Sequence, residues 1–212
     1  KEGTVTMSWS ISSTPWAAAA IAIKPAVSSV IQKAPNYISL VNDLVGYWSF
    51  NGPDMAGTVA YDRSGQGNNG TLTNSPVRAI GKLGQALSFD GSNDYVAVAN
   101  AGVTFDGTTN SSYALWFYNR GSATVQNLLN QPKDDLTDSQ GNITVSSADV
   151  LSTAIWESPS TITIGSTNIG RNSWHHVVVV MNQVADTRQM YLDGVLNAND
   201  TVTGDGSFPF TK

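Results

Sequence analysis

The chain has 212 residues, a formal net charge of −5, no cysteine and only 13% charged side chains. The absence of cysteine excludes disulfides, thiolate metal sites and a cysteine nucleophile, and the acidic balance argues against a nucleic-acid partner. A surface poor in charge but rich in Ser, Thr, Asn and Gly is typical of secreted β-sandwich proteins.

The first 26 residues predict a β-hairpin. Apolar and polar side chains alternate over 4–10, a turn follows at 12–15, and the apolar run 16–23 ends before Pro25. This run is far shorter than the ~20 residues of a membrane span, so we expect no membrane insertion. No signal peptide stands at the first residue, which suggests a mature chain or an excised piece. Residues 27–43 follow as a linker.

The stretch from residue 44 to residue 98 predicts short strands separated by turn-rich loops. Strands are expected over 44–50, 70–73, 86–89 and 95–98, where apolar residues alternate with polar or small ones. The loops between them are rich in Gly, Asn, Asp and Ser, which are turn formers.

The next part of the chain continues the same pattern. Further strands are expected over 112–119, 125–130, 142–146, 150–156 and 161–164, with an acidic loop at 131–138. Strands at intervals of about 8–12 residues, without a long helix, predict an all-β antiparallel sandwich.

Residues 173–196 predict three antiparallel strands in succession. The run of four valines from Val177 to Val180 favours a strand, and because both of its faces are apolar we expect it in the middle of a sheet, covered on both sides. Asp193 and Gly194 form the two-residue pattern of a type I′ hairpin turn.

Three blocks of sequence resemble the laminin-G-like branch of the concanavalin A-like lectin/glucanase superfamily. They are LVGYWSFNG with the later YDRSGQGNNGTL, then GKLGQALSFDGSNDYVAV, and finally the Trp-x-His strand start with its Tyr-x-Asp-Gly hairpin. The blocks occur in family order. The resemblance implies a jelly-roll β-sandwich domain over 44–212.

The resemblance also implies that the sandwich lacks its last strands, because the family's usual closing strand does not follow residues 208–212. A sheet with an unpaired edge exposes backbone hydrogen-bonding groups. The surplus hairpin of residues 1–26 could fill this gap, in the same chain or in a neighbouring copy. The alternative is that the piece retains the tail of one domain and lacks the end of the next.

Catalysis is not expected. Glycosidases of this superfamily need two carboxylates that flank a sugar bond, yet the chain has only Glu2 and Glu157, far apart in sequence. His175 and His176 are adjacent on a strand and point to opposite faces, so they cannot bind one metal together. We therefore predict a non-enzyme.

Calcium is the cofactor that the sequence favours. Two loops carry the oxygen-rich side chains that Ca²⁺ prefers, Asp62 and Asn68 in one and Asp90, Asn93 and Asp94 in the other. The resemblance adds to this expectation, since many laminin-G-like domains bind a structural Ca²⁺. The alternative is that these residues serve as turn formers that accept main-chain N–H bonds.

Sugar binding would require exposed aromatic side chains beside polar groups. The candidates are Tyr95, Tyr118 and Trp156. The other tryptophans of the strands, Trp48, Trp116 and Trp174, are expected in the core.

These observations predict an extracellular or cell-surface module of bacterial origin that binds a carbohydrate or a cell surface and acts in adhesion. The second hypothesis is a structural subunit of a filament or layer that assembles with copies of itself by strand complementation. The third is a divergent glycoside hydrolase.

Overall fold

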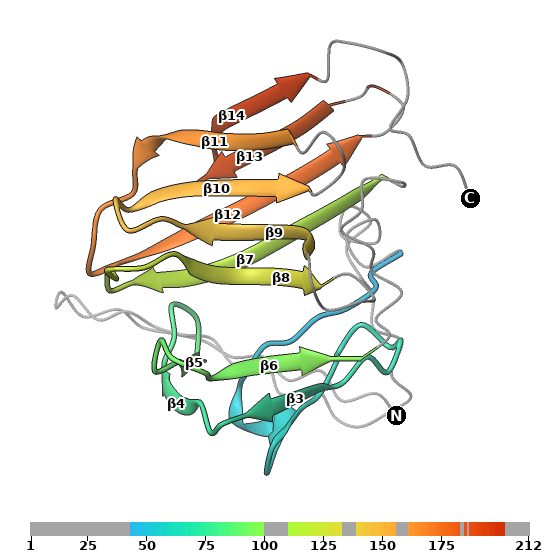
Figure 1. Ribbon diagram of the computed structural model, residues 1–212. Helices are drawn as coiled ribbons and strands as arrows, with labels where there is room; N and C mark the ends of the chain where they lie inside the picture. The colour runs from blue at the N-terminus through green and yellow to red at the C-terminus, as the bar shows by residue number, and fades with distance from the viewer. Residues whose placement is uncertain are drawn as a thin grey trace, which may run out of the picture. The chain divides into compact units, whose positions relative to one another are not determined.

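The computed structural model describes residues 43–99, 110–132, 139–155, 161–182, 185 and 187–201 (Figure 1). All of them belong to one compact unit, Leu40–Lys212. The predicted N-terminal hairpin, nearly all of the linker, and residues 202–212 lie outside the described residues. The predicted domain bounds and the expected loss of the last strands therefore stay predictions.

The described chain is all-β apart from one 3-10 turn, η2 (Gly52–Asp54). The first strands are β1 (Met55–Ala56), β2 (Val59–Ala60), β3 (Gly70–Thr73), β4 (Val77–Ile80), β5 (Gln85–Ser88) and β6 (Tyr95–Val98). The longer strands are β7 (Ser111–Asn119), β8 (Gln126–Pro132), β9 (Ser139–Val145), β10 (Val150–Ile155), β11 (Thr161–Asn168), β12 (Ser173–Asn182), β13 (Thr187–Leu192) and β14 (Val195–Thr201).

Two four-stranded antiparallel sheets form the sandwich. One has the strand order β11-β10-β9-β8 and the other has the order β14-β13-β12-β7. Figure 1 shows the first sheet lying in front of the second. Two further sheets, β1-β2-β3-β6 and the hairpin β4-β5, come from the preceding part of the chain. This confirms the predicted antiparallel β-sandwich.

The core lies between the two larger sheets and follows from the two-residue period of their strands. Odd-numbered residues of β7 and β12 point inward, as do the even-numbered residues of β13. The buried apolar cluster consists of Tyr113, Phe117, Ile143, Val145, Leu151, Ile169, Val177, Val179, Met181, Met190 and Leu192. Burial of side chains of this size contributes roughly 1.5–3 kcal/mol each before the entropic cost of ordering them.

The strand β12 occupies the middle of its sheet, as predicted, between β13 and β7. Its second face differs from the prediction. Val178 and Val180 are only half-buried there, because the outward positions of the neighbouring β7 are exposed. The Asp193–Gly194 turn is confirmed, since both residues have positive φ, 51° and 82°, as a type I′ turn requires.

The predicted strand over 44–50 is not formed, and the segment joins no sheet. Its backbone groups are bonded instead by the loop at 61–69. Asp62 accepts the N–H of Tyr47 at 2.9 Å, the N–H of Arg63 donates to the Tyr47 carbonyl at 2.8 Å, and the Asn68 amide donates to the Val45 carbonyl at 2.8 Å. These contacts satisfy the backbone without a strand partner.

Candidate functional site

Four aromatic rings lie together on the outward face of the β7–β12 strand pair. They are Trp116 and Tyr118 of β7 with Trp174 and His176 of β12, called the aromatic face below. The antiparallel register places Trp116 opposite His176 and Tyr118 opposite Trp174. The ring centroids are 4.8 Å apart in the first pair and 5.6 Å apart in the second, which is edge-to-face. Rings that pack in this way hold one another in fixed positions.

The aromatic face is open to solvent. Trp116 is 43% exposed and Tyr118 is 42% exposed, while Trp174 and His176 are half-buried. The expectation that Trp116 is a core residue is therefore wrong, and Trp174 also lies on the outward face. The inward positions of β7 belong to Tyr113, Leu115 and Phe117, because a strand can direct only alternate residues to one side.

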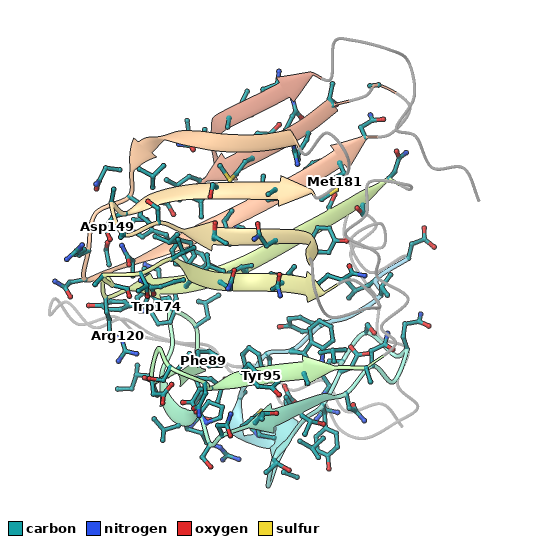
Figure 2. All side chains as sticks on the ribbon, in the orientation of Figure 1. Phe89, Tyr95, Arg120, Asp149, Trp174 and Met181 are labelled. Carbon is teal, nitrogen blue, oxygen red and sulfur yellow. The ribbon has the colours of Figure 1, made fainter. Side chains whose placement is uncertain are left out.

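Two cations border the aromatic face. The ammonium of Lys82, in the β4–β5 turn, lies 5.6 Å from the centroid of the Trp116 ring, within the range of a cation–π contact. Arg120 follows the last residue of β7, and its Nη2 donates to the Phe89 carbonyl at 2.7 Å. Figure 2 shows Arg120 and Phe89 near each other beside Trp174.

The three predicted ligand residues fall in different places. Tyr118 is part of the aromatic face and packs against Trp174. Tyr95 is 51% exposed but lies on β6, in another sheet. Trp156 lies outside the described residues. The structure thus places only Tyr118 in a cluster of aromatic rings.

The first predicted calcium loop is organised around the carboxylate of Asp62. Oδ1 accepts the N–H groups of Tyr47 and Ser64 at 2.9 and 2.8 Å, and Oδ2 accepts the Ser64 hydroxyl and the Asn68 N–H at 2.6 and 3.0 Å. Burial alone would raise the pKa of Asp62, but these hydrogen bonds lower it to about 2. Four donors face the carboxylate, and this arrangement agrees with the alternative that Asp62 is a turn former.

The second predicted calcium loop is also built on hydrogen bonds. Asp90 Oδ1 accepts the N–H groups of Ser92, Asn93 and Asp94 at 2.8, 3.2 and 3.4 Å, and Asp94 Oδ2 accepts the Asp90 N–H at 3.1 Å. The Ser92 N–H bond and its neighbours lower the pKa of Asp90. Among the described residues, no three His, Cys, Asp or Glu side chains gather, but a Ca²⁺ site can also use Asn and main-chain carbonyl oxygens. Calcium stays a prediction for both loops.

A serine, a histidine and an aspartate are linked in series at the start of β12. His175 lies 2.8 Å from the Ser173 hydroxyl through Nε2 and 2.8 Å from Asp193 Oδ2 through Nδ1. Asp193 Oδ1 also accepts the His176 N–H at 2.8 Å. Burial alone would raise the pKa of Asp193. The hydrogen bonds from His175 and His176 outweigh this effect, so the pKa lies below its usual value.

The histidine of this Ser–His–Asp series lies on the core side of the sheet, between Ser173 and Asp193. The imidazole of His175 is 12% exposed and its ring packs 5.7 Å from that of Phe117, on the core side of the sheet. The carboxylate of Asp193 is bound from two sides, so it ties the β13–β14 turn to β12.

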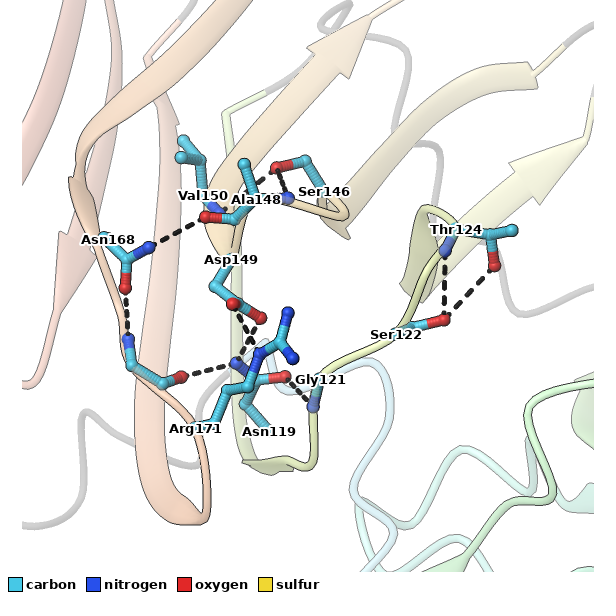
Figure 3. Close-up of polar contacts among 11 residues, drawn as sticks. Asn119, Gly121, Ser122, Thr124, Ser146, Ala148, Asp149, Val150, Asn168 and Arg171 are labelled. Carbon is cyan, nitrogen blue, oxygen red and sulfur yellow. Dashed lines mark hydrogen bonds and ion pairs between the residues drawn. The ribbon is translucent and has the colours of Figure 1, made fainter.

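A polar cluster joins three turns at one end of the sandwich (Figure 3). The Asn119 amide donates to Asp149 Oδ1 at 3.1 Å and, in a shorter contact of 2.5 Å, to the Gly170 carbonyl. Arg171 Nε donates to Asp149 Oδ2 at 2.6 Å. The Asn119 bond, followed by Arg171, lowers the pKa of Asp149. We call these three side chains the turn clamp. They position the end of β7 that carries Tyr118.

The antiparallel sandwich agrees with the family to which the sequence is similar. A comparison with protein families matches residues 90–212 to the concanavalin A-like lectin/glucanases superfamily. Since this match covers more than half of the chain, the chain belongs to that superfamily. A comparison with curated proteins found no matching sequence.

Solved structures with the same fold are distant in sequence. Domain 4 of AbnA, a GH43 extracellular arabinanase from Geobacillus stearothermophilus in complex with arabinotriose, is 18% identical, with a TM-score of 0.54 over 76% of each chain. The binding domain of Paraclostridial Mosquitocidal Protein 1 is 16% identical, with a TM-score of 0.55 over 77% of this chain and 41% of that one. An S-layer domain-containing protein from Clostridium thermocellum is 20% identical, with a TM-score of 0.45 over 74% and 71%. The first two of these likenesses, with TM-scores above 0.5, show the fold.

Trp116 and Trp174 were missed as surface residues by sequence reasoning. The alternation of residues 112–119 separates two sets of side chains, but both sets contain large apolar residues, so the pattern does not indicate which set faces the core. One signal was available in the sequence: Trp174 shares a face of its strand with the polar His176. The structure then pairs His176 with Trp116.

Proposed function

We propose that the chain is an extracellular, non-catalytic module that binds carbohydrate through its aromatic face. The observation that carries the proposal is the exposure of Trp116 and Tyr118 beside Trp174 and His176 on one flat sheet surface. Large exposed aromatic rings in a fixed arrangement are costly to leave in water unless a ligand covers them.

The chemistry of the aromatic face suits a sugar. The apolar C–H side of a sugar ring stacks on an indole or phenol ring, and its hydroxyls bond to polar groups at the edge. The imidazole of His176, the Tyr118 hydroxyl and the outward Gln189 of β13 are polar groups on this sheet face. A rigid platform lowers the entropic cost of binding, since the rings are already positioned by one another.

The relatives support the same class of ligand. The AbnA domain, which shares the fold, was solved with arabinotriose, and the mosquitocidal protein domain is described as a binding domain. The part of the chain that the structure describes has no helix long and apolar enough to cross a membrane. We also propose that the chain is extracellular, as the arabinanase AbnA is.

Binding of the soluble chain to a glycan array, followed by calorimetry with the glycans that bind, tests the proposal. Trp116→Ala should abolish binding, and Tyr118→Ala should weaken it. Tyr47→Ala is the matched control, because Tyr47 is also an exposed aromatic but lies far outside the β7–β12 sheet. Glycan binding that survives in Trp116→Ala, with the fold intact by circular dichroism, would place the site elsewhere.

A further inference from the structure

We propose that the saccharide recognised by the aromatic face is acidic, with a carboxylate on its sugar ring, and that Lys82 binds this carboxylate. The inference rests on the proposed function and adds the charge of the ligand. Its starting point is that Lys82 stands over Trp116 while the ring itself is 43% exposed. A sugar stacked on Trp116 would therefore meet an ammonium at its edge.

The ammonium of Lys82 is available to a ligand. The ion pairs of the described residues are Arg63–Asp54, Arg171–Asp149 and His175–Asp193, and none of them includes Lys82. Its cation–π contact uses the charge but none of the three N–H donors, since a ring face offers no lone pair. These donors are free to bond to a carboxylate or to water.

The hairpin that carries Lys82 is basic in an acidic chain. The β4–β5 hairpin, residues 77–88, contains Arg78 and Lys82 but no Asp or Glu, so it is positive in a chain of net charge −5. The electrostatic contrast favours an anionic group at the hairpin over the rest of the molecule.

A second cation stands at the other end of the aromatic face. Arg120 comes two residues after Tyr118, and one of its five N–H donors is used on the Phe89 carbonyl. No ion pair of the described residues includes Arg120. Trp116 and Arg120 are four residues apart, about 13 Å along an extended chain. Cations at both ends suit a saccharide that carries a carboxylate on more than one unit.

The acidic groups in this region are already bonded within the protein. Asp193, which lies beside His176, directs one carboxylate oxygen to His175 and the other to the His176 N–H. Asp90, which follows Phe89, directs Oδ1 to three N–H groups of its own loop. Both carboxylates keep their negative charge, but their oxygens are already bonded to donors of the protein.

Calorimetry with paired probes tests the inference. Each probe is a uronate trisaccharide, of galacturonate, glucuronate or mannuronate, and its partner is the methyl ester of the same trisaccharide, which keeps the ring but removes the charge. The protein should bind at least one acid about 3- to 10-fold more tightly than its ester, and salt should reduce this preference.

Three variants separate the two proposals. Lys82→Gln should lose the preference for acid over ester and still bind the ester, Lys82→Arg should keep the preference, and Trp116→Ala should lose both ligands. Equal affinity for acid and ester, a preference that survives in Lys82→Gln, or binding of neutral glycans alone overturns the inference and leaves the proposed function standing. Failure of the wild-type chain to bind any glycan of the array overturns both.

Discussion

The carboxylate of Asp62 accepts the backbone N–H of Tyr47 at 2.9 Å, across fifteen positions of the sequence. The same carboxylate also accepts bonds from Ser64 and Asn68. This side chain thereby stabilises the loop at 61–69 and holds the segment 44–50, which forms no strand, against that loop. Asp62 is therefore a structural residue, whose charge is needed because only a carboxylate offers four acceptor positions.

Replacing Asp62 by Asn should destabilise the protein by about 1 kcal/mol at neutral pH, because an amide oxygen accepts fewer of the bonds from these exposed and part-buried donors. The folded-state pKa of Asp62, about 2, lies below its unfolded value. Its contribution is therefore fully present above about pH 4 and is lost as the pH falls toward 2. Urea unfolding of both proteins from pH 2 to pH 7 measures this, and parallel pH profiles would contradict it.

We expect calcium to act through Asp94, because the carboxylate of Asp62 already accepts four hydrogen bonds. Millimolar Ca²⁺ should raise the melting temperature above that in EGTA, since a ligand of the native state stabilises it. Asp94→Ala should abolish this shift, whereas Asp62→Ala should lower the melting temperature equally with and without calcium. Identical melting curves in EGTA and in calcium would contradict a calcium site.

Replacing a large side chain by alanine should destabilise the protein far more in the core of the sandwich than in the exposed β4–β5 hairpin. Ile143 is 0% exposed between the sheets, and Ile143→Ala should cost about 2–5 kcal/mol through lost burial and a cavity. Ile80 is 89% exposed in β4, so the same change there should alter stability by less than about 0.5 kcal/mol. Urea denaturation compares the two, and similar costs would show that the β4–β5 hairpin is packed in solution.

Incubation with β-glucans, xylans or galactans should release no reducing sugar, because the chain lacks a second glutamate near Glu157 to complete an acid and nucleophile pair. The Ser173–His175–Asp193 series should not provide another activity, since His175 is packed on Phe117. Turnover that disappears in Glu157→Gln, or in Ser173→Ala, would show that the chain is an enzyme.

Strand complementation by the N-terminal hairpin predicts a clear effect of deleting residues 1–26. The truncated chain should become monomeric and less stable, and an added peptide of residues 1–25 should restore both properties. Light scattering after size exclusion and thermal unfolding measure the two effects. Unchanged assembly and stability would contradict complementation.

The strands were predictable where the pattern of side chains alone decides them. Gly70–Thr73 and Tyr95–Val98 form over the ranges expected, and the Asp193–Gly194 turn follows from two residues that accept positive φ. The strands β1, β2 and β4 were not predicted, because such short strands exist only through pairing with β2, β3 and β5.

The candidate site was less predictable for the same physical reason. Tyr118 was expected at the surface, but Trp116 was assigned to the core, since period two separates the faces of a strand without saying which one is inside. The contact of Lys82 with Trp116 joins the β4–β5 turn to a strand of another sheet. It cannot be predicted from the sequence around either residue. The role of Asp62 likewise depends on Tyr47, which is distant in the chain.

The turn clamp affects how this end of the sandwich opens. Asn119 ends a strand of one sheet, Asp149 lies in the β9–β10 turn of the other, and Arg171 lies in the connection between β11 and β12. None of the three turns can fray alone, because each would break a bond that another turn needs. Their amide hydrogens should therefore exchange with solvent as one cooperative unit. The end of β7 that carries Tyr118 should therefore be protected from exchange together with the other two turns.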